Sequence, residues 1–183
     1  AAYLEGQVQV TNKLSLVGGV RVTKDDHFDE VPITPRATAI YSITDKLTAK
    51  YIYTEAFVAP APYFAFSTFD NGTLLATTNP DVAPETAQTH ELAFTYYDDY
   101  LTLGIASYYG TQSDMITVAD RGAPQNIVAD PVLLNGDPLQ PRTLVQTANG
   151  GNSVRYGADV YGKITCGEFS SWLSYSFVDF DET

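Results

Sequence analysis

The side chains that most often perform chemistry are few in this sequence. His27 and His90 are the only histidines, and Cys166 is the only cysteine. One cysteine cannot form an intrachain disulfide, and two separated histidines indicate neither a multi-histidine zinc site nor a Ser-His-Asp triad. We therefore expect no enzyme, no metal site and no cofactor.

An acidic cluster lies around His27. It comprises Asp25, Asp26, Asp29 and Glu30. Carboxylates can bind Ca²⁺, but this spacing differs from that of a calcium-binding loop, so a solvated acidic loop is the favoured interpretation.

Aromatic side chains crowd the segment after Pro60. They are Tyr63, Phe64, Phe66 and Phe69. Exposed aromatic rings can stack on a small ligand, so these residues form our candidate binding site. The alternative, which we favour, is that they pack against one another and order a long loop.

The composition indicates a folded, apolar chain. The 183 residues are 44% apolar and only 17% charged, whereas ordinary soluble domains are about 25% charged. The formal net charge of −12 repels phosphate groups. A nucleic acid is therefore not expected as a partner.

Apolar and polar residues alternate with a period of two, which predicts β-strands. From Val154 to Ile164, one face is mainly apolar and the other carries Arg155, Asp159 and Lys163. Similar runs begin near Ala2, Leu14, Arg36, Leu47, Ala87, Leu101, Val154 and Phe169. We predict about eight strands and no amphipathic helix.

Short and long connections alternate along the chain. Short turns are expected at 11–13, 44–46, 98–100 and 166–168, and long polar loops at 24–33, 58–85 and about 113–151. Transmembrane β-barrels have short turns at one rim and long loops at the other, with an apolar outer face and a polar lumen. The prediction is an all-β, antiparallel up-and-down meander of about eight strands, part of a large transmembrane β-barrel.

Two other architectures fit the same alternation. A soluble β-sandwich for binding or adhesion also has one buried face and one wet face, and eight strands can close a small barrel by themselves. Tyrosines near the expected strand ends favour a membrane barrel, because aromatic residues concentrate at membrane interfaces, although they could also be cross-strand pairs in any sheet. These tyrosines are Tyr51, Tyr53, Tyr96, Tyr97, Tyr108, Tyr109 and Tyr175.

Both ends of the chain are expected at the long-loop rim. A short turn follows the first strand, and eight strands bring the chain back to the rim where it began. Complete bacterial barrels normally begin and end at the other rim, so we expect residues 1–183 to be a partial barrel domain cut inside two external loops. No apolar run is long enough for a spanning helix, and Ala1–Glu5 lacks the features of a signal peptide.

Charged residues lie mainly on the polar strand faces. They are Arg21, Arg36, Lys50, Glu91, Arg155, Asp159 and Lys163. They could contact a ligand in the barrel lumen, but a network of charges between neighbouring strands is the favoured interpretation.

Short motifs follow one another along these strands. Pro35-Arg36 opens a strand, Thr44–Thr48 makes a turn, Glu55–Pro60 reads E-A-F-V-A-P, Asn79–Glu85 reads N-P-D-V-A-P-E, and His90–Ala93 reads H-E-L-A. In this order they resemble the middle of the barrel of TonB-dependent receptors, a family with a wall of roughly 22 strands around an N-terminal plug. Gly157–Asp159 and Trp172–Ser176 resemble later strands of that family.

Several positions depart from the family pattern. Val58 stands where Arg is usual, Val82 and Ala93 are milder changes, and Asp159 replaces Glu. The positions that match the family motifs are Phe57, Pro60, Asn79, Pro80, Pro84, Glu85 and Glu91. The two prolines at 60 and 84 suit places where a strand leaves its ladder, and the two glutamates are expected to face water or the lumen.

The resemblance implies uptake of a scarce nutrient, such as a ferric siderophore, cobalamin or an oligosaccharide, through the outer membrane of a Gram-negative bacterium. The implied partners are outer-membrane lipid, the small-molecule nutrient and TonB. TonB would act through a plug, and neither a plug domain nor a TonB box is expected in this chain.

Overall fold

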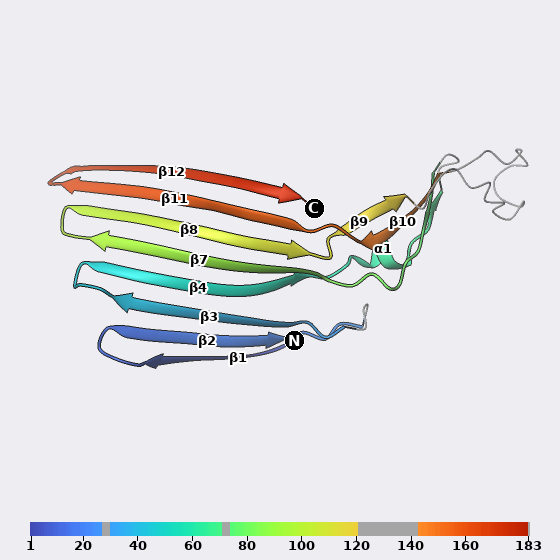
Figure 1. Cartoon of the computed structure of the whole chain (residues 1–183), viewed down its shortest axis with the longest axis horizontal. Helices are drawn as coiled ribbons and strands as arrows, with labels where there is room; N and C mark the ends of the chain where they lie inside the picture. Colours follow the sequence, from blue (N-terminus) through green and yellow to red (C-terminus); the bar gives the residue numbers. More distant parts are fainter. Residues whose placement is uncertain (27–29, 71–73, 121–142, 183) are drawn as a thin grey trace, which may run out of the picture.

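Eight long strands form one antiparallel sheet in the computed structural model, which describes residues 1–26, 30–70, 74–120 and 143–182 (Figure 1). The strands are β1 (Ala2–Gln9), β2 (Leu14–Val22), β3 (Ile33–Ser42), β4 (Leu47–Val58), β7 (Glu85–Tyr97), β8 (Leu101–Ser113), β11 (Ser153–Cys166) and β12 (Phe169–Glu182). Neighbours in the sheet follow the order of the chain. The prediction of an eight-stranded up-and-down meander is therefore confirmed.

The connections alternate as the sequence indicated. Tight turns join the strands at one end of the sheet, and the loop segments and both termini lie at the other end (Figure 1). Two of the turns read T-x-K-L, at 11–14 and 44–47. In each turn the threonine hydroxyl accepts hydrogen bonds from the following lysine and leucine N–H groups, at 3.2 and 3.0 Å. The threonine side chain thus closes the turn.

The sheet has one apolar face and one polar face, because directly opposed residues of neighbouring strands point to the same side. One row of the apolar face runs through Val8, Leu16, Ala39, Tyr51 and Leu92. The adjacent row of the polar face runs through Gln7, Val17, Thr38, Ile52, Glu91 and Tyr108. The alternation in the sequence therefore predicted the two faces correctly.

The two alternative architectures are wrong for this chain. Among the described residues, the buried apolar side chains are Pro60, Val82, Pro84 and Val145, and all four lie outside the eight-stranded sheet. The sheet does not bury a face against a second layer, as a β-sandwich must. β1 and β12 lie at opposite edges of the sheet and do not pair, so the strands do not close a small barrel.

The long loops contain secondary structure that was not expected from the sequence. A short helix, α1 (Pro62–Phe66), precedes four short strands, β5 (Phe69–Asp70), β6 (Leu74–Thr77), β9 (Ile116–Asp120) and β10 (Thr143–Asn149). These strands form a second sheet in the order β5-β6-β10-β9, which we call the loop sheet. β6 and β10 pair in parallel, with Leu74 opposite Thr143. Such distant pairing leaves no local signal in the sequence.

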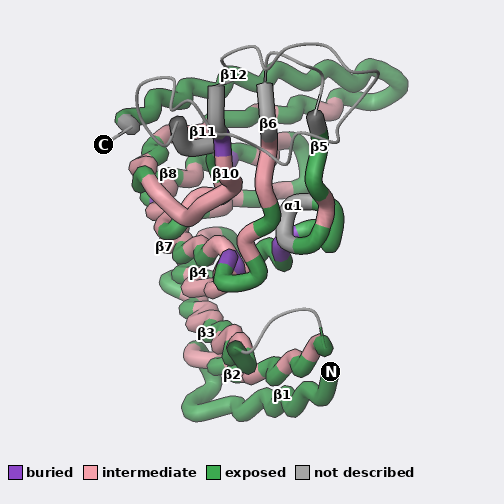
Figure 2. Tube along the Cα trace, turned by 90° about the vertical axis from the view of Figure 1, so that its right-hand side faces the viewer, coloured by how far each residue is buried: buried purple, intermediate pink, exposed green. Residues whose placement is uncertain are grey.

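The loop sheet continues the β8–β11 hairpin after a bend (Figure 1). Asp114 takes a left-handed conformation with φ of 57°, and Gly151 on the returning strand has φ of 83°. Left-handed residues break the strand conformation, so they bend the hairpin here. Buried positions gather near this end of the main sheet, where loop segments meet (Figure 2).

In the ranges that the structure describes, no helix is long and apolar enough to cross a membrane.

Candidate functional site

Every lysine and arginine of the eight main-sheet strands lies on the polar face. They are Arg21, Arg36, Lys50, Arg155 and Lys163. The chain as a whole has a formal net charge of −12, so this face gathers the scarce positive charge. The same face also carries Glu5, Glu85, Glu91 and Asp159, so positive and negative side chains are mixed on it.

Arg36 of β3 pairs with Glu5 of β1 across the intervening strand. Gly19 of β2 is opposite both residues in the register. A Cβ atom at Gly19 would lie 3.1 Å from Arg36 Nε and 3.2 Å from the Leu4 carbonyl oxygen. Because Gly19 has no side chain, the Arg36 guanidinium can extend over β2 and reach Glu5.

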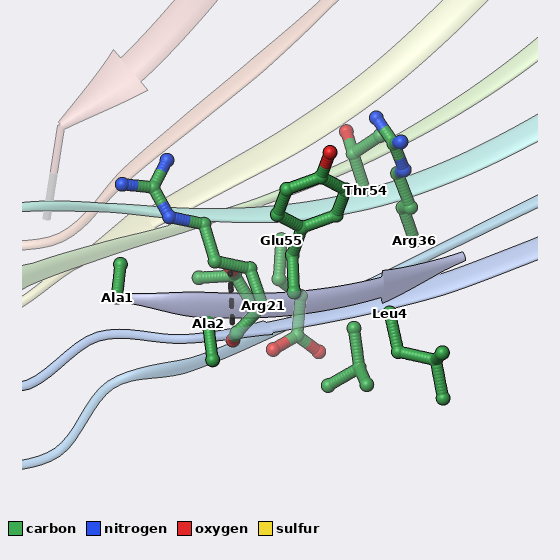
Figure 3. Close-up of a pocket in the computed structure, with 10 residues that line it drawn as sticks. Ala1, Ala2, Leu4, Arg21, Arg36, Thr54 and Glu55 are labelled. Carbon is green, nitrogen blue, oxygen red and sulfur yellow. Dashed lines mark hydrogen bonds between the residues drawn. The ribbon is translucent and has the colours of Figure 1, made fainter.

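Figure 3 shows this end of the sheet beside a cavity of about 560 Å³. Arg21, Arg36 and Thr54 project to one side of the strands, whereas Ala2 and Leu4 project to the other (Figure 3). Glu55 projects to the same side as Ala2 and Leu4 (Figure 3), so at this end of the sheet the apolar face also carries a charged side chain.

The expected charge network reduces to this one pair. Within the described residues, Arg21, Lys50, Arg155 and Lys163 have no side-chain ion pair, and Glu91 and Asp159 have none either. The charged strand positions expected from the sequence are all on the polar face, but Glu5 was not among the expected residues. The unpaired cations remain available to a ligand.

Two tyrosines of the polar face lie over glycines of the neighbouring strand. Tyr161 of β11 is opposite Gly104 of β8, and Tyr108 of β8 is opposite Gly157 of β11. A Cβ atom at either glycine would overlap the tyrosine side chain. The glycines thus give the rings room to lie against the wall, an arrangement that also protects the glycine backbone.

The segment Asn79–Glu85 connects the two long loops, and we call it the loop joint. Asn79 Nδ2 donates to the Thr147 carbonyl oxygen at 2.7 Å. Asn149 Oδ1 accepts from the Ala83 N–H at 2.7 Å, and Asn149 Nδ2 donates to the carbonyl oxygens of Ala83 and Asp114, both at 2.8 Å. Val82 is 2% exposed within the joint.

Glu85 connects the loop joint to β8 and β9 by hydrogen bonds. Its carboxylate accepts from Gln112 Nε2 at 2.9 Å and from the Ile116 N–H at 2.6 Å. Gln112 belongs to β8 and Ile116 opens β9, so one carboxylate holds both sides of the bend. Glu85 was expected as a motif position that faces water or the lumen, and its contacts with Gln112 and Ile116 could not be predicted from the sequence.

The other motif positions occupy distinct places. Pro60 and Pro84 are buried just outside β4 and β7, as expected for prolines that end a ladder, whereas Pro80 is exposed. Phe57 lies on the apolar face opposite Thr86, and Glu91 lies on the polar face opposite Tyr108. The proline positions could be read from the sequence because their missing N–H excludes them from the ladder.

The candidate loop aromatics lie on α1 and β5. Tyr63, Phe66 and Phe69 are 59%, 53% and 47% exposed. The side chain of Phe64 lies outside the described part of the structure. The three described rings each retain about half of their surface.

Aromatic residues also form a row on the apolar face. Tyr53, His90, Tyr109 and Tyr156 are opposed in succession across β4, β7, β8 and β11. The Tyr53 and His90 ring centroids are 4.9 Å apart, and the Tyr51 hydroxyl lies 2.8 Å from His90 Nδ1. Towards the loops, the next positions on this face include Glu55 and Gln88. The row marks where the apolar face becomes polar. The expected placement of tyrosines near strand ends is correct for Tyr96 and Tyr97, which end β7. It is wrong for the tyrosines that lie within β4, β8 and β12, which are Tyr51, Tyr53, Tyr108, Tyr109 and Tyr175.

A salt bridge joins two of the tight turns. Lys46 Nζ lies 2.7 Å from Asp98 Oδ2. Hydrogen bonding to Asp98 raises the pKa of Lys46, and the bond from Lys46 lowers the pKa of Asp98, assisted by the Asp99 N–H. Both groups are thereby held in their charged forms.

Within the described ranges, no three His, Cys, Asp or Glu side chains are grouped to hold a metal ion. His27 and Asp29 of the acidic cluster lie outside those ranges.

Comparison with known proteins identifies the family to which this architecture belongs. The model of the family described as TonB dependent receptor-like, beta-barrel matches residues 1–183. No curated protein matches the sequence.

Solved receptors share the fold at low sequence identity. The siderophore receptor PirA from Acinetobacter baumannii is 17% identical with a TM-score of 0.79, over 96% of this chain and 27% of that one. A mutant ferric enterobactin receptor, PfeA from Pseudomonas aeruginosa, in complex with enterobactin, is 17% identical with a TM-score of 0.77, over 96% and 26% of the two chains. The FrpB iron transporter from Neisseria meningitidis is 15% identical with a TM-score of 0.69, over 98% and 25%. The chain therefore spans about a quarter of the length of these receptors.

Proposed function

The chain belongs to the family of TonB-dependent receptor-like β-barrels, and from this premise we propose that it forms part of the wall and external loops of a receptor that takes up a scarce nutrient across a bacterial outer membrane. The apolar face would contact lipid, and the polar face would line the lumen. Residues 1–183 act as a partial barrel domain in this proposal, and TonB acts through a plug supplied by the rest of the receptor. No enzymatic step is required.

We infer that the nutrient is anionic, as a ferric siderophore can be. The observation that carries this inference is an excess of unpaired cations on the face assigned to the lumen. Among the described residues of this face, four strand cations have no side-chain ion pair or hydrogen bond, whereas two acids, Glu91 and Asp159, lack such a partner. Cations on a wall with a low-dielectric outer side concentrate anions at the entrance. Siderophore receptors among the structural neighbours support this choice over cobalamin or an oligosaccharide.

The loop aromatics would make the first contact with the nutrient. Tyr63, Phe66 and Phe69 are exposed at the loop end of the sheet, where the external loops of a receptor lie. Aromatic rings bind planar ligands with little loss of side-chain entropy. Phe64 is included in this proposal because it lies in the same helix.

Uptake by the full-length receptor tests the proposal. The gene would be expressed in a Gram-negative host that lacks its own siderophore receptors, and cells would be supplied with radioactive iron as ferric enterobactin or as an uncharged ferric trihydroxamate. We expect accumulation of the anionic chelate, its loss when the host lacks TonB, and much less accumulation of the uncharged chelate.

The outcomes separate the parts of the proposal. Equal uptake in hosts with and without TonB contradicts energised transport. Equal uptake of the two chelates contradicts selection by charge.

A further inference from the structure

A second cavity, of about 280 Å³, lies on the polar face at the loop end of the sheet. Two rows of directly opposed residues line it. The first row is Thr89, Gly110, Arg155 and Phe180, and the second includes Ala87, Gln112 and Ser153. Met115, at the bend between β8 and β9, closes the loop side. The cavity is large enough for one ring and its substituents.

Arg155 supplies the charge of this cavity. Its side chain is exposed and makes no ion pair or hydrogen bond within the described residues. Arg36 lies on the same row but is occupied by Glu5. Of the acidic residues nearby, Glu85 is occupied by Gln112 and the Ile116 N–H. Glu182 is opposite Ser153, and its side chain lies outside the described part of the structure. Among the described side chains, Arg155 is therefore the unneutralised cation at this level of the wall.

Glu91 and Asp159 also face this side of the sheet. They lie one and two rows nearer the tight turns than Arg155, and neither forms an ion pair with it. The guanidinium is thus free to bind a planar anion with two parallel hydrogen bonds.

Apolar groups flank the guanidinium. Phe180 is directly opposite Arg155 and is 65% exposed. Gly110 forms the floor, where a Cβ atom would lie 3.3 Å from the Gln88 carbonyl oxygen. The absent side chain leaves the floor flat between Thr89 and Arg155. An open aromatic face beside a cation suits a ligand that is both planar and anionic.

The loop joint fixes the upper wall of the cavity. Gln112 lines the cavity and donates to Glu85, which also holds the first N–H of β9. The position of the cavity wall is therefore set by the same carboxylate that holds the loop sheet.

We propose that this cavity is a binding subsite for an aromatic anion. The anionic oxygens bind Arg155, and the ring packs on Phe180 and Met115. The assignment of the aromatic anion to a transported nutrient rests on the proposed function, whereas binding of a free aromatic acid does not.

Binding of para-fluorobenzoate to the full-length receptor in detergent, followed by fluorine NMR, tests the subsite. We expect Arg155→Gln to weaken binding about tenfold or more, as expected for loss of a charge-assisted hydrogen bond. Arg155→Lys should retain part of the affinity, which shows that the wall still folds. Lys13→Gln, which removes a cation from a tight turn, should leave the affinity within about twofold, because Lys13 is far from the cavity along the strands.

A second measurement locates the ligand. Crystals of the receptor soaked in para-bromobenzoate should show an anomalous bromine peak beside Phe180, and Phe180→Ala should weaken binding of benzoate but not of acetate. Equal affinity in the wild type and Arg155→Gln, or a bromine peak elsewhere, overturns the subsite.

The source of the aromatic anion is settled by uptake. If Arg155→Gln lowers uptake of ferric enterobactin but not of the uncharged trihydroxamate chelate, the subsite serves the nutrient. If benzoate binds at Arg155 but the wild-type receptor transports neither chelate, the subsite holds and the proposed function fails.

Discussion

Arg36 and Glu5 form an ion pair that spans a whole strand, with Gly19 of that strand lying between them. Three consecutive strands are thus linked on the polar face by one contact. Both side chains are partly exposed, so the pair itself contributes little to stability. Its larger effect is to keep Arg36 neutralised while other cations of this face stay free.

Replacing Gly19 should disturb this contact. We expect Gly19→Val to lower the free energy of unfolding of the full receptor by about 1–2 kcal/mol, because a side chain there meets Arg36 and the Leu4 backbone. Gly18→Val is the matched control, since a Cβ atom at Gly18 has no neighbour within 4 Å. Urea unfolding in detergent measures the difference. Equal stability of the two variants would show that the space above Gly19 is not needed for the contact between Arg36 and Glu5.

The pairing of Tyr161 with Gly104 gives a second expectation. Gly104→Ala should destabilise the receptor by about 1–3 kcal/mol through overlap with the ring. Adding Tyr161→Ala should restore most of this loss, because the second change removes the overlapping atoms. Additive losses in the double variant, measured by the same unfolding experiment, would contradict the pairing.

Asn149 should control the rigidity of the loop joint. Asn149→Ala removes three side-chain hydrogen bonds to Ala83 and Asp114, so local opening should become easier by about 1–3 kcal/mol. Hydrogen exchange of the amides in 79–85 and 143–149 is expected to accelerate, while exchange in β1–β4 stays unchanged. Asn152→Ala is the control, because Asn152 is exposed and has no side-chain hydrogen bond among the described residues. Similar exchange in both variants would argue against the joint.

The Lys46–Asp98 salt bridge should make stability depend on pH at both extremes. The lowered pKa of Asp98 stabilises the fold above its ordinary value of 3.8, and this contribution is lost as the pH falls through the lowered pKa. The raised pKa of Lys46 stabilises the fold below its ordinary value of 10.5, and this contribution is lost as the pH rises through the raised pKa.

Thermal unfolding across pH measures this contribution. Asp98→Asn should lower the melting temperature at neutral pH, and the gap to the wild type should close well below pH 3.8. A difference in melting temperature that persists in acid would show that the Lys46–Asp98 salt bridge is not its cause.

The loop aromatics should affect ligand binding and not folding. Tyr63→Ala, Phe66→Ala and Phe69→Ala are each expected to weaken nutrient binding by up to about tenfold, because each removes an exposed ring. Tyr100→Ala is the control, since Tyr100 is 65% exposed at the opposite, tight-turn end. An equal loss of affinity in Tyr100→Ala and in the loop variants would show that the loop aromatics are not a specific binding site.

The sequence by itself determined the eight strands, their alternating connections and the two faces. These features are local: a period of two assigns each residue to a face, and Thr, Asp, Lys and Gly at fixed places close the turns. The positions of Arg155 and Lys163 on the polar face followed directly from this period. So did the exclusion of Pro60 and Pro84 from the strands.

Only the tertiary structure decided which residues meet. Register places Gly19 beneath Arg36 and Gly104 beneath Tyr161, and a shift of one residue would separate both pairs without changing the local pattern. Contacts between distant segments, such as Asn149 with Ala83, depend on how the loops return to the wall. The short, parallel pairing of β6 with β10 depends on the same return of the chain, so no local pattern could predict it.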